Sequence, residues 1–195
     1  MTIEAASTDV LDFWFGAAGS PEFGTQRKIW FAKDAAFDRS IVGRFGATIE
    51  RALRGELDDW AASPEGALAR ILLLDQFTRN AFRDDKRAFA GDAQALAAAT
   101  AMVGSRHDEA LPPFMRMFVY MPFEHAEGIA MQDESIRLFT RLGAGAPDLQ
   151  HMLDYAQKHR AQIERFGRFP HRNASLGRAS TADELAFCAE PGSRF

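Results

Sequence analysis

The feature that most constrains the fold is an apolar residue at every fourth position between residues 37 and 53. The five residues are Phe37, Ile41, Phe45, Ile49 and Leu53. Residues four apart lie one above the other on an α-helix, so the run predicts a helix of about four turns with one continuous apolar face. Such a face must be covered by another element. The chain is therefore expected to consist of helices that pack side by side.

Helix start and stop signals recur along the rest of the chain. Ser63-Pro64-Glu65 is typical of a helix start, Thr181 to Glu184 reads as a capping box, and glycines follow most of the apolar runs. No segment alternates like a strand. The expected helices begin near residue 8 or 9 and end at 15, then cover 37–53, 64–80, 93–103, 114–120, 122–142 and 147–166, with a last one from 181.

These signals predict an all-α fold of antiparallel helical hairpins, because the joints are short. We expect residues 1–195 to form one domain, with a frayed tail at residues 190–195.

Composition excludes several classes of function. The formal charge of −4 and the pI near 5.7 argue against nucleic-acid binding. The longest apolar stretch, around Ile71 to Leu74, is too short to span a membrane. The first five residues do not resemble a secretory signal, and the single cysteine, Cys188, excludes an internal disulfide framework. A cytoplasmic protein is expected, and its oligomeric state is left open.

A first group of polar residues continues an apolar helix face. Asp75 and Arg79 are four residues apart, on the face that carries Leu68 and Leu72, and Asn80 follows. A charged pair on a core face must be paired or shifted in pKa to be tolerated. One interpretation is a structural salt bridge with a helix-end cap. The other is part of a ligand site.

A second group surrounds Pro122, where a helix is expected to end or kink. Its members are Arg116, Tyr120, Glu124, His125, Glu127 and Gln132. If a new helix starts at Pro122, Glu124 and His125 lie in its first turn beside free backbone donors. His125 is then a candidate general acid or base oriented by a carboxylate. Alternatively, Glu124 and Glu127 only complement the helix dipole and His125 is half-buried.

A third group is a loop after residue 166 that is rich in hydrogen-bond donors. It contains Arg168, His171, Arg172, Asn173 and Arg178, with Phe169 and Pro170 between them. Guanidinium groups bind carboxylates and phosphates bidentately, so the loop suits an anion. The alternative is that it caps helix ends and holds down the last helix. His159, on an apolar stripe, belongs with this group or is a satisfied core residue.

Motifs for metals and cofactors are missing. The five histidines show neither an HExxH motif nor a paired spacing of four, so no metal site is expected. No Walker, GxGxxG or GxSxG pattern occurs, so no cofactor is expected. Cys188 has no neighbouring histidine in the sequence, which leaves a cysteine nucleophile unsupported.

Together the polar groups also carry a family resemblance. The matching stretches are residues 10–15, Trp30-Phe31, Phe37-Asp38, 74–80, 88–90, Arg116, Phe118, 120–122, 124–127, Gln132, His159, 166–173 and 176–178. On these stretches the chain resembles the bacterial family called domain of unknown function 924. The resemblance implies a tetratricopeptide-like superhelix of stacked hairpins and no settled activity. The family usually has Pro where Thr78 stands and Ser where Ala126 stands. Because this chain lacks the serine hydroxyl, His125 and Glu127 become the stronger candidates for a functional role at this place.

The leading hypothesis is that the three groups converge on one pocket for a small anionic or polar organic molecule. The anion would be fixed by Arg79, Arg168 and Arg172 and oriented by Asn80, Tyr120 and Asn173, with Arg116, Glu124, His159 and Arg178 also in the site. His125 and His171 would transfer protons with Asp75 or Glu127, in metal-independent acid–base or hydrolytic chemistry.

The rival hypothesis is a non-catalytic protein-interaction module. Helical-hairpin superhelices often present concave surfaces to peptides. On that interpretation the polar groups are structural, and the binding face should expose aromatic residues such as Trp14, Trp30 and Phe31.

Overall fold

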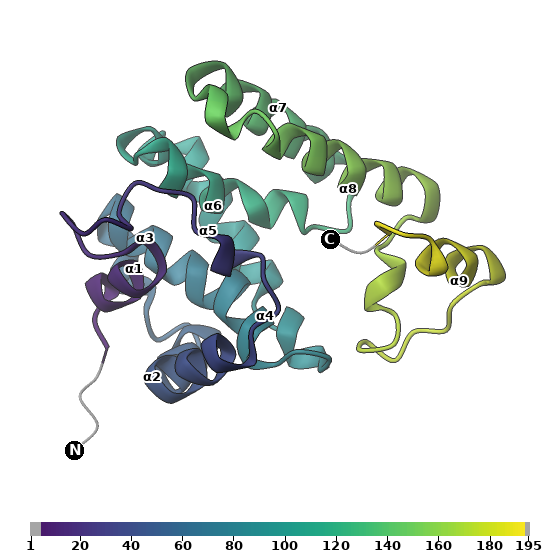
Figure 1. Ribbon diagram of the computed structural model, residues 1–195, viewed down its shortest axis with the longest axis horizontal. Coiled ribbons are helices and arrows are strands. Elements are labelled where there is room, and N and C mark those ends of the chain that lie inside the picture. The colour runs from purple at the N-terminus through teal and green to yellow at the C-terminus, as the bar shows by residue number, and fades with distance from the viewer. Residues whose placement is uncertain (1–4, 194–195) are drawn as a thin grey trace. The chain divides into compact units, whose positions relative to one another are not determined.

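The computed structural model describes residues 5–193, and all regular structure in that range is helical (Figure 1). Residues 1–4 and 194–195 lie outside this range. The predictions about the first five residues and about the tail at residues 190–195 therefore fall partly outside the described residues. The chain divides into two compact units, and each has buried apolar side chains of its own. Unit 1 is formed by Met1–Arg83 and Arg87–Pro122, and unit 2 by Asp84–Lys86 and Phe123–Phe195. The all-α prediction is confirmed, whereas the single domain and the superhelix stay predictions.

Unit 1 contains the helices that the apolar stripes predict. They are α1 (Ser7–Phe15), α2 (Ala35–Leu53), α3 (Pro64–Ile71), α4 (Thr78–Ala81), α5 (Asp92–Gly104) and most of α6 (Pro113–Glu124), joined by 3₁₀ turns η1 (Lys28–Trp30), η2 (Asp58–Ala62), η4 (Lys86–Phe89) and η5 (His107–Ala110). The Ser63 hydroxyl accepts a hydrogen bond from Gly66 N at 3.1 Å, so the predicted start of α3 is confirmed. Asp34 caps α2 in the same way, through the amides of Ala36 and Phe37.

An aromatic cluster forms the core of unit 1. Trp14, Phe45, Phe77 and Phe118 are almost fully buried and contact one another or shared aromatic neighbours. The indole N–H of Trp30 donates to the Trp14 carbonyl at 2.8 Å. Because the last carbonyls of a helix have no partner within it, this bond helps to close the end of α1. The many phenylalanines of the sequence thus serve the helix contacts.

A π-helical segment interrupts the helix that carries the first polar group. Helix α3, the π-helical segment η3 (Leu72–Phe77) and helix α4 follow one another with no residue between them. The Thr78 hydroxyl donates to the Leu74 carbonyl at 2.8 Å within this stretch. Such segments are rare and occur frequently at functional sites. Helix α5 packs against it, with Gly91 next to the Leu74 backbone.

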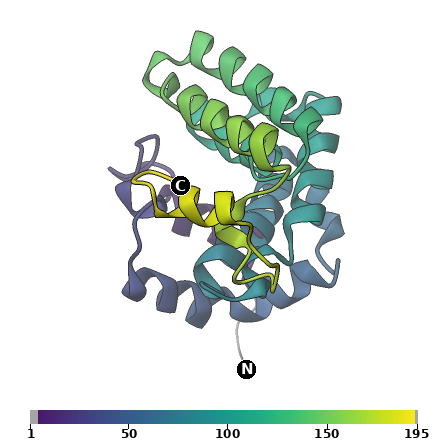
Figure 2. The ribbon, with the colours of Figure 1, turned by 90° about the vertical axis from the view of Figure 1, so that its right-hand side faces the viewer.

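Unit 2 is built around a helical hairpin. Helices α7 (Ile129–Gly145) and α8 (Met152–Phe166) lie side by side in both views, joined by η6 (Pro147–Leu149) (Figures 1 and 2). Gly167 ends α8 in the left-handed conformation with φ of 70°, as its position in the sequence indicated. The turn η7 (Pro170–Arg172) and helix α9 (Ala182–Ala189) follow, and the Thr181–Glu184 capping box at the start of α9 is confirmed.

The helix break that was expected at Pro122 lies further along the chain. Pro122 sits inside α6, which ends only at Glu124, and α7 begins at Ile129. The prediction that Glu124 and His125 lie in a first helical turn is therefore wrong. The Gln132 amide donates at 2.7 Å to the carbonyls of both Glu124 and Ala126, which stabilises the end of α6 from outside. Pro122 has no amide N–H, so α6 lacks the hydrogen bond that this residue would otherwise donate to the carbonyl four residues before it.

No helix within the described range has the combination of length and apolar character that crossing a membrane requires.

Candidate functional site

The first polar group lies on the π-helical segment and is joined there by an acid from α5. Arg79 forms a bidentate pair with Asp92 at 2.8 and 3.1 Å and contacts Asp75 Oδ1 at 3.1 Å. Burial opposes the charge on Arg79, but Asp75 and Asp92 outweigh it and raise its pKa. Asp75 is only 1% exposed and also accepts a hydrogen bond from Gln76 at 2.6 Å. Arg79 and Asp75 thus have protein partners within unit 1.

Asn80 is held by a second acid, Asp38 of α2. Its amide donates to Asp38 Oδ1 at 2.8 Å, and Arg83 binds both oxygens of the same carboxylate at 2.5 and 2.9 Å. Burial raises the pKa of Asp38, but the hydrogen bonds from Arg83 and Asn80 lower it further than burial raises it. This arrangement joins α2 to the chain that follows α4.

Arg116 and Tyr120 both contact the segment around η5. Arg116 donates to the carbonyls of Glu109 and Leu111 at 3.0 and 2.9 Å. The Tyr120 hydroxyl donates to Asp108 at 2.6 Å, and both side chains are fully buried. Asp108 did not stand out in the sequence, because nothing local marks an acid in a short loop as buried. These contacts give Arg116 and Tyr120 a role in holding η5.

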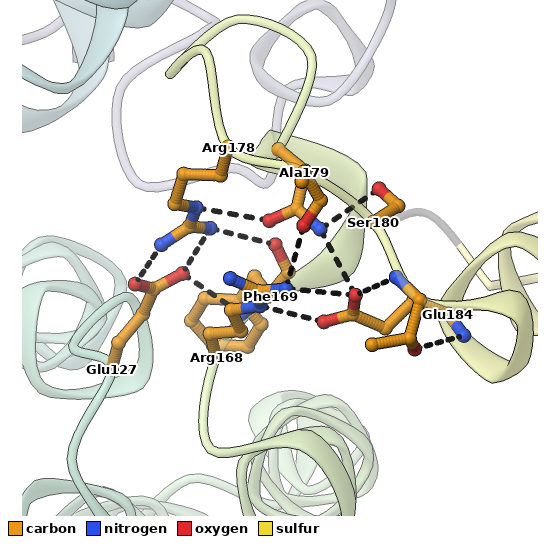
Figure 3. Close-up of polar contacts among 9 residues, drawn as sticks. Glu127, Arg168, Phe169, Arg178, Ala179, Ser180 and Glu184 are labelled. Atoms are coloured by element: carbon orange, nitrogen blue, oxygen red, sulfur yellow. Dashed lines mark hydrogen bonds and ion pairs between the residues drawn. The ribbon is translucent and has the colours of Figure 1, made fainter.

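In unit 2, two bidentate ion pairs fix the donor-rich loop (Figure 3). Arg178 binds both oxygens of Glu127 at 2.6 and 2.9 Å. Glu127 also accepts the Phe169 amide at 2.8 Å, while Arg178 donates to the Phe169 carbonyl at 3.1 Å. Burial raises the pKa of Glu127, but the hydrogen bonds from Arg178 and Phe169 lower it overall. Glu127 therefore holds the loop by the Phe169 amide, and its partner Arg178 holds it by the Phe169 carbonyl.

The second pair joins the loop to α9. Arg168 binds Glu184 at 2.6 and 2.8 Å, and the Glu184 carboxylate also accepts the Thr181 amide at 2.7 Å (Figure 3). The hydrogen bond from Arg168, followed by that from Thr181, lowers the pKa of Glu184 to about 2. Asn173 bridges the two pairs, since its oxygen accepts from Arg178 at 2.9 Å and its amide donates to Glu184 at 3.4 Å.

Three further basic residues of unit 2 contact the buried ring of Phe169, and a fourth lies next to them. The Arg172 guanidinium lies over this ring at 4.4 Å from its centre. The ring centres of His159 and His171 are 5.5 and 5.7 Å from it, and His125 is 6.2 Å from His159. We call His125, His159, His171 and Arg172 the imidazole–arginine cluster. Arg172 and His159 are 6% exposed, whereas His125 and His171 are intermediate, so these two form its outer side.

His159 forms the centre of this cluster and is oriented by two oxygens. Its Nδ1 lies 2.9 Å from the Tyr155 carbonyl and 3.2 Å from Glu124 Oε1. A carbonyl can only accept, so Nδ1 carries the proton and the lone pair of the neutral ring is on Nε2. Burial, followed by electrostatic repulsion from His125, Arg172 and His171, lowers the pKa of His159 to about 3. Glu124 is 4% exposed, which makes the two a buried carboxyl–imidazole pair.

The structure thus groups the predicted site residues by unit. Unit 1 brings together Asp75 with Arg79, while Asn80, Arg116 and Tyr120 each have other partners. Unit 2 brings together the four members of the imidazole–arginine cluster with Glu124, and beside them Glu127, Arg168, Asn173 and Arg178. The pairing of His125 or His171 with Asp75 or Glu127 for proton transfer stays a prediction. The structure places the Glu124 carboxyl 3.2 Å from Nδ1 of His159.

An open depression of about 440 Å³ lies on another part of unit 2. Its lining includes Arg165, Phe166, Arg168, Asp183 and Glu184. It contains none of the cluster's imidazoles, and its two arginines either bind Glu184 or lie over Phe166. The lining of the depression therefore carries both positive and negative side chains, which suits an anion less well than the imidazole–arginine cluster does.

Two of the three aromatic residues that the interaction-module hypothesis places on the surface are buried. Trp14 and Trp30 are 0% and 5% exposed, so the expectation that they are displayed on a binding face is wrong. Both were needed to fill the core between α1 and the helices packed on it. Phe31 is 55% exposed, as expected.

Fold and site together define an all-α protein with a buried carboxyl–imidazole pair in its C-terminal unit. Residues 10–192 match the family described as bacterial protein of unknown function (DUF924), and the chain belongs to this family. A solved structure of a protein of unknown function from Agrobacterium tumefaciens is 40% identical, with a TM-score of 0.80 over 94% of this chain and 96% of that chain. No curated protein matches the chain.

Proposed function

We propose that unit 2 binds a small anionic molecule at the imidazole–arginine cluster, beside the Glu124–His159 pair. The observation that carries the proposal is the gathering of His125, His171 and Arg172 around one buried imidazole. Basic groups this close repel one another, and a bound anion relieves the repulsion. Burial makes the effect larger than it would be in water.

Arg172 is the guanidinium that best suits the anion. Arg168 and Arg178 already bind carboxylates bidentately, which uses the geometry that a carboxylate or phosphate ligand would need. Arg172 lies over the buried ring of Phe169, close enough to His159 to lower the pKa of that imidazole. The two bidentate pairs fix the loop that carries Arg172 and therefore act as positioning groups.

The Glu124–His159 pair supplies acid–base chemistry for the bound molecule in this proposal. A carboxyl group that fixes the tautomer of an imidazole is the arrangement by which proteins orient a general base. The reaction class that follows is metal-independent proton transfer or hydrolysis. Asp75, Arg79, Asn80, Arg116 and Tyr120 have structural roles in unit 1 in this proposal.

Calorimetric titration with inorganic phosphate, sulfate and a series of mono- and dicarboxylates tests the binding step. We expect at least one of these anions to bind wild-type protein and to bind Arg172→Gln at least tenfold more weakly. Arg172→Lys keeps the charge and should recover part of the affinity, which separates loss of charge from loss of folding.

Arg160→Gln is the matched control. Arg160 lies on the same helix as His159, but it pairs with Asp133 and Glu164 on the surface. This variant should bind like wild type. Absence of binding by the whole anion series, or equal affinities of wild type and Arg172→Gln, would overturn the proposal.

A further inference from the structure

The open depression of unit 2 is lined by the last turn of α8, the loop after it and the start of α9. With a volume of about 440 Å³ it is large enough for a small organic molecule. None of its lining residues belongs to the imidazole–arginine cluster, so a ligand in the depression would occupy a second site. The lining residues are Arg165, Phe166, Arg168, Thr181, Asp183 and Glu184.

Two of the four charged side chains in this lining neutralise each other. Arg168 binds both oxygens of Glu184 at 2.6 and 2.8 Å and donates to the Ala179 carbonyl at 2.9 Å (Figure 3). The hydrogen bond from Arg168, followed by that from Thr181, lowers the pKa of Glu184 to about 2, so this carboxylate is ionised at neutral pH. The pair therefore adds no net charge to the depression.

The other two charged side chains are Arg165 and Asp183, one positive and one negative. The Arg165 guanidinium lies over the rings of Phe166 and Phe187, at 4.6 and 5.7 Å from their centres. This stacking restrains the guanidinium but uses none of its five N–H groups. Among the residues that the structure describes, neither Arg165 nor Asp183 forms a hydrogen bond or an ion pair with its side chain. Both side chains are exposed to solvent, where a ligand can reach them.

We propose that the depression binds a free α-amino acid, whose carboxylate pairs with Arg165 and whose ammonium group pairs with Asp183. A simple anion would be attracted by Arg165 but repelled by the carboxylates of Asp183 and Glu184, and a simple cation would be repelled by the two arginines. A molecule with one charge of each sign satisfies Arg165 and Asp183 together. The half-buried ring of Phe166 favours an apolar side chain on this ligand.

Three related ligands separate the two charges of the amino acid. Phenylalanine carries both charges, N-acetylphenylalanine keeps only the carboxylate, and phenylalanine amide keeps only the ammonium group at about pH 6. Amide NMR titration of the labelled protein measures the affinity for each ligand and locates its site. We expect phenylalanine to bind about two- to fivefold more tightly than either derivative, as the loss of one exposed ion pair predicts. The largest shifts should occur at the amides of Phe166, Asp183 and Glu184.

Two variants test the partner of each charge. Arg165→Gln should weaken the binding of phenylalanine about two- to fivefold and leave that of phenylalanine amide, which has no carboxylate, unchanged. Asp183→Asn should weaken the binding of phenylalanine to a similar extent and leave that of N-acetylphenylalanine unchanged. Because both side chains are exposed, both variants should fold like wild type, which circular dichroism checks.

Asp154→Asn is the matched control. Asp154 is also an exposed acid in the first turn of a helix, that of α8, but it does not line the depression. First-turn acids complement the helix dipole, so this variant has the same effect on a helix start as Asp183→Asn without removing a lining charge. It should bind all three ligands like wild type.

The outcomes concern the depression alone. Absence of phenylalanine binding, or equal affinities for phenylalanine and its two derivatives, would overturn the inference. Weaker binding by Arg165→Gln with full binding by Asp183→Asn would show that the depression recognises an anion, which also contradicts it. The proposed anion site uses none of the lining residues, so the anion titrations with Arg172→Gln decide that site separately.

Discussion

Replacing Gly91 with alanine tests whether the contact between α5 and the π-helical segment is as close as the structure places it. A Cβ atom at Gly91 would lie 2.3 Å from the Leu74 carbonyl oxygen and 2.9 Å from the Leu74 Cα. These are backbone atoms, which cannot turn aside as the end of a side chain can. The helix or the π-helical segment must therefore move, and the Thr78 hydroxyl bond to the same carbonyl would be disturbed.

The size of the effect is the difference of two terms. Forcing an extra methyl into a close-packed contact costs about 1–3 kcal/mol. Alanine at a backbone conformation that it tolerates recovers about 0.4–1 kcal/mol by restricting the unfolded chain. Gly91 has φ of −92° and ψ of −7°, which alanine adopts readily, so the recovery applies. The two ranges give a net loss of about 0–2.6 kcal/mol, centred near about 1.3 kcal/mol, which is a fall in Tm of about 3–5 °C for a chain of this length.

Urea unfolding followed by circular dichroism measures this difference, with Gly104→Ala as the control. Gly104 ends the same helix, and a Cβ there meets nothing within 4 Å. The control should match or exceed wild type in stability. If Gly91→Ala is as stable as Gly104→Ala, α5 does not approach the Leu74 backbone as described and the reasoning fails.

Three further predictions follow from the capping box and the two perturbed acid–base groups. Thr181→Ala should lower stability by about 0.5–2 kcal/mol because α9 loses its N-cap, whereas Thr181→Ser should be near wild type in the same unfolding assay. Glu184 has a pKa lowered from 4.5 to about 2, so its contribution to stability is present above pH 4.5 and is lost as the pH falls toward 2; Glu184→Gln should flatten that acid limb. The pKa of His159 falls from 6.5 to about 3 on folding. Between these two values the unfolded chain binds a proton that the folded chain does not, so lowering the pH destabilises the fold by up to about 1.4 kcal/mol per pH unit. His159→Gln should remove this slope, and an unchanged slope in the variant would show that His159 is not buried in its neutral form.

Element types were predictable from the sequence because they depend on local chemistry. The stripe from Phe37 to Leu53, the Ser63 cap and the Thr181 box each act within a few residues, and all three appear as expected. The break after α6 was misplaced for the opposite reason. Gln132, eight residues beyond Glu124, satisfies the carbonyls at the end of α6, and that contact is invisible to local rules.

The partners of the candidate-site residues could not be predicted for the same reason, because they are far apart in the sequence. A buried acid and a buried imidazole each appeared in the sequence as polar residues that needed partners, but Glu124 and His159 are 35 positions apart and their pairing depends on how α8 packs beside the end of α6. Glu127 is one of the two acids that the sequence offers as partners for His125 or His171, and in the folded chain it binds Arg178, which is 51 positions away. A charged group is buried at low cost only where a partner compensates its charge. Glu127 and Glu184 each bind an arginine of the loop, so the position of the loop depends on both of these ion pairs.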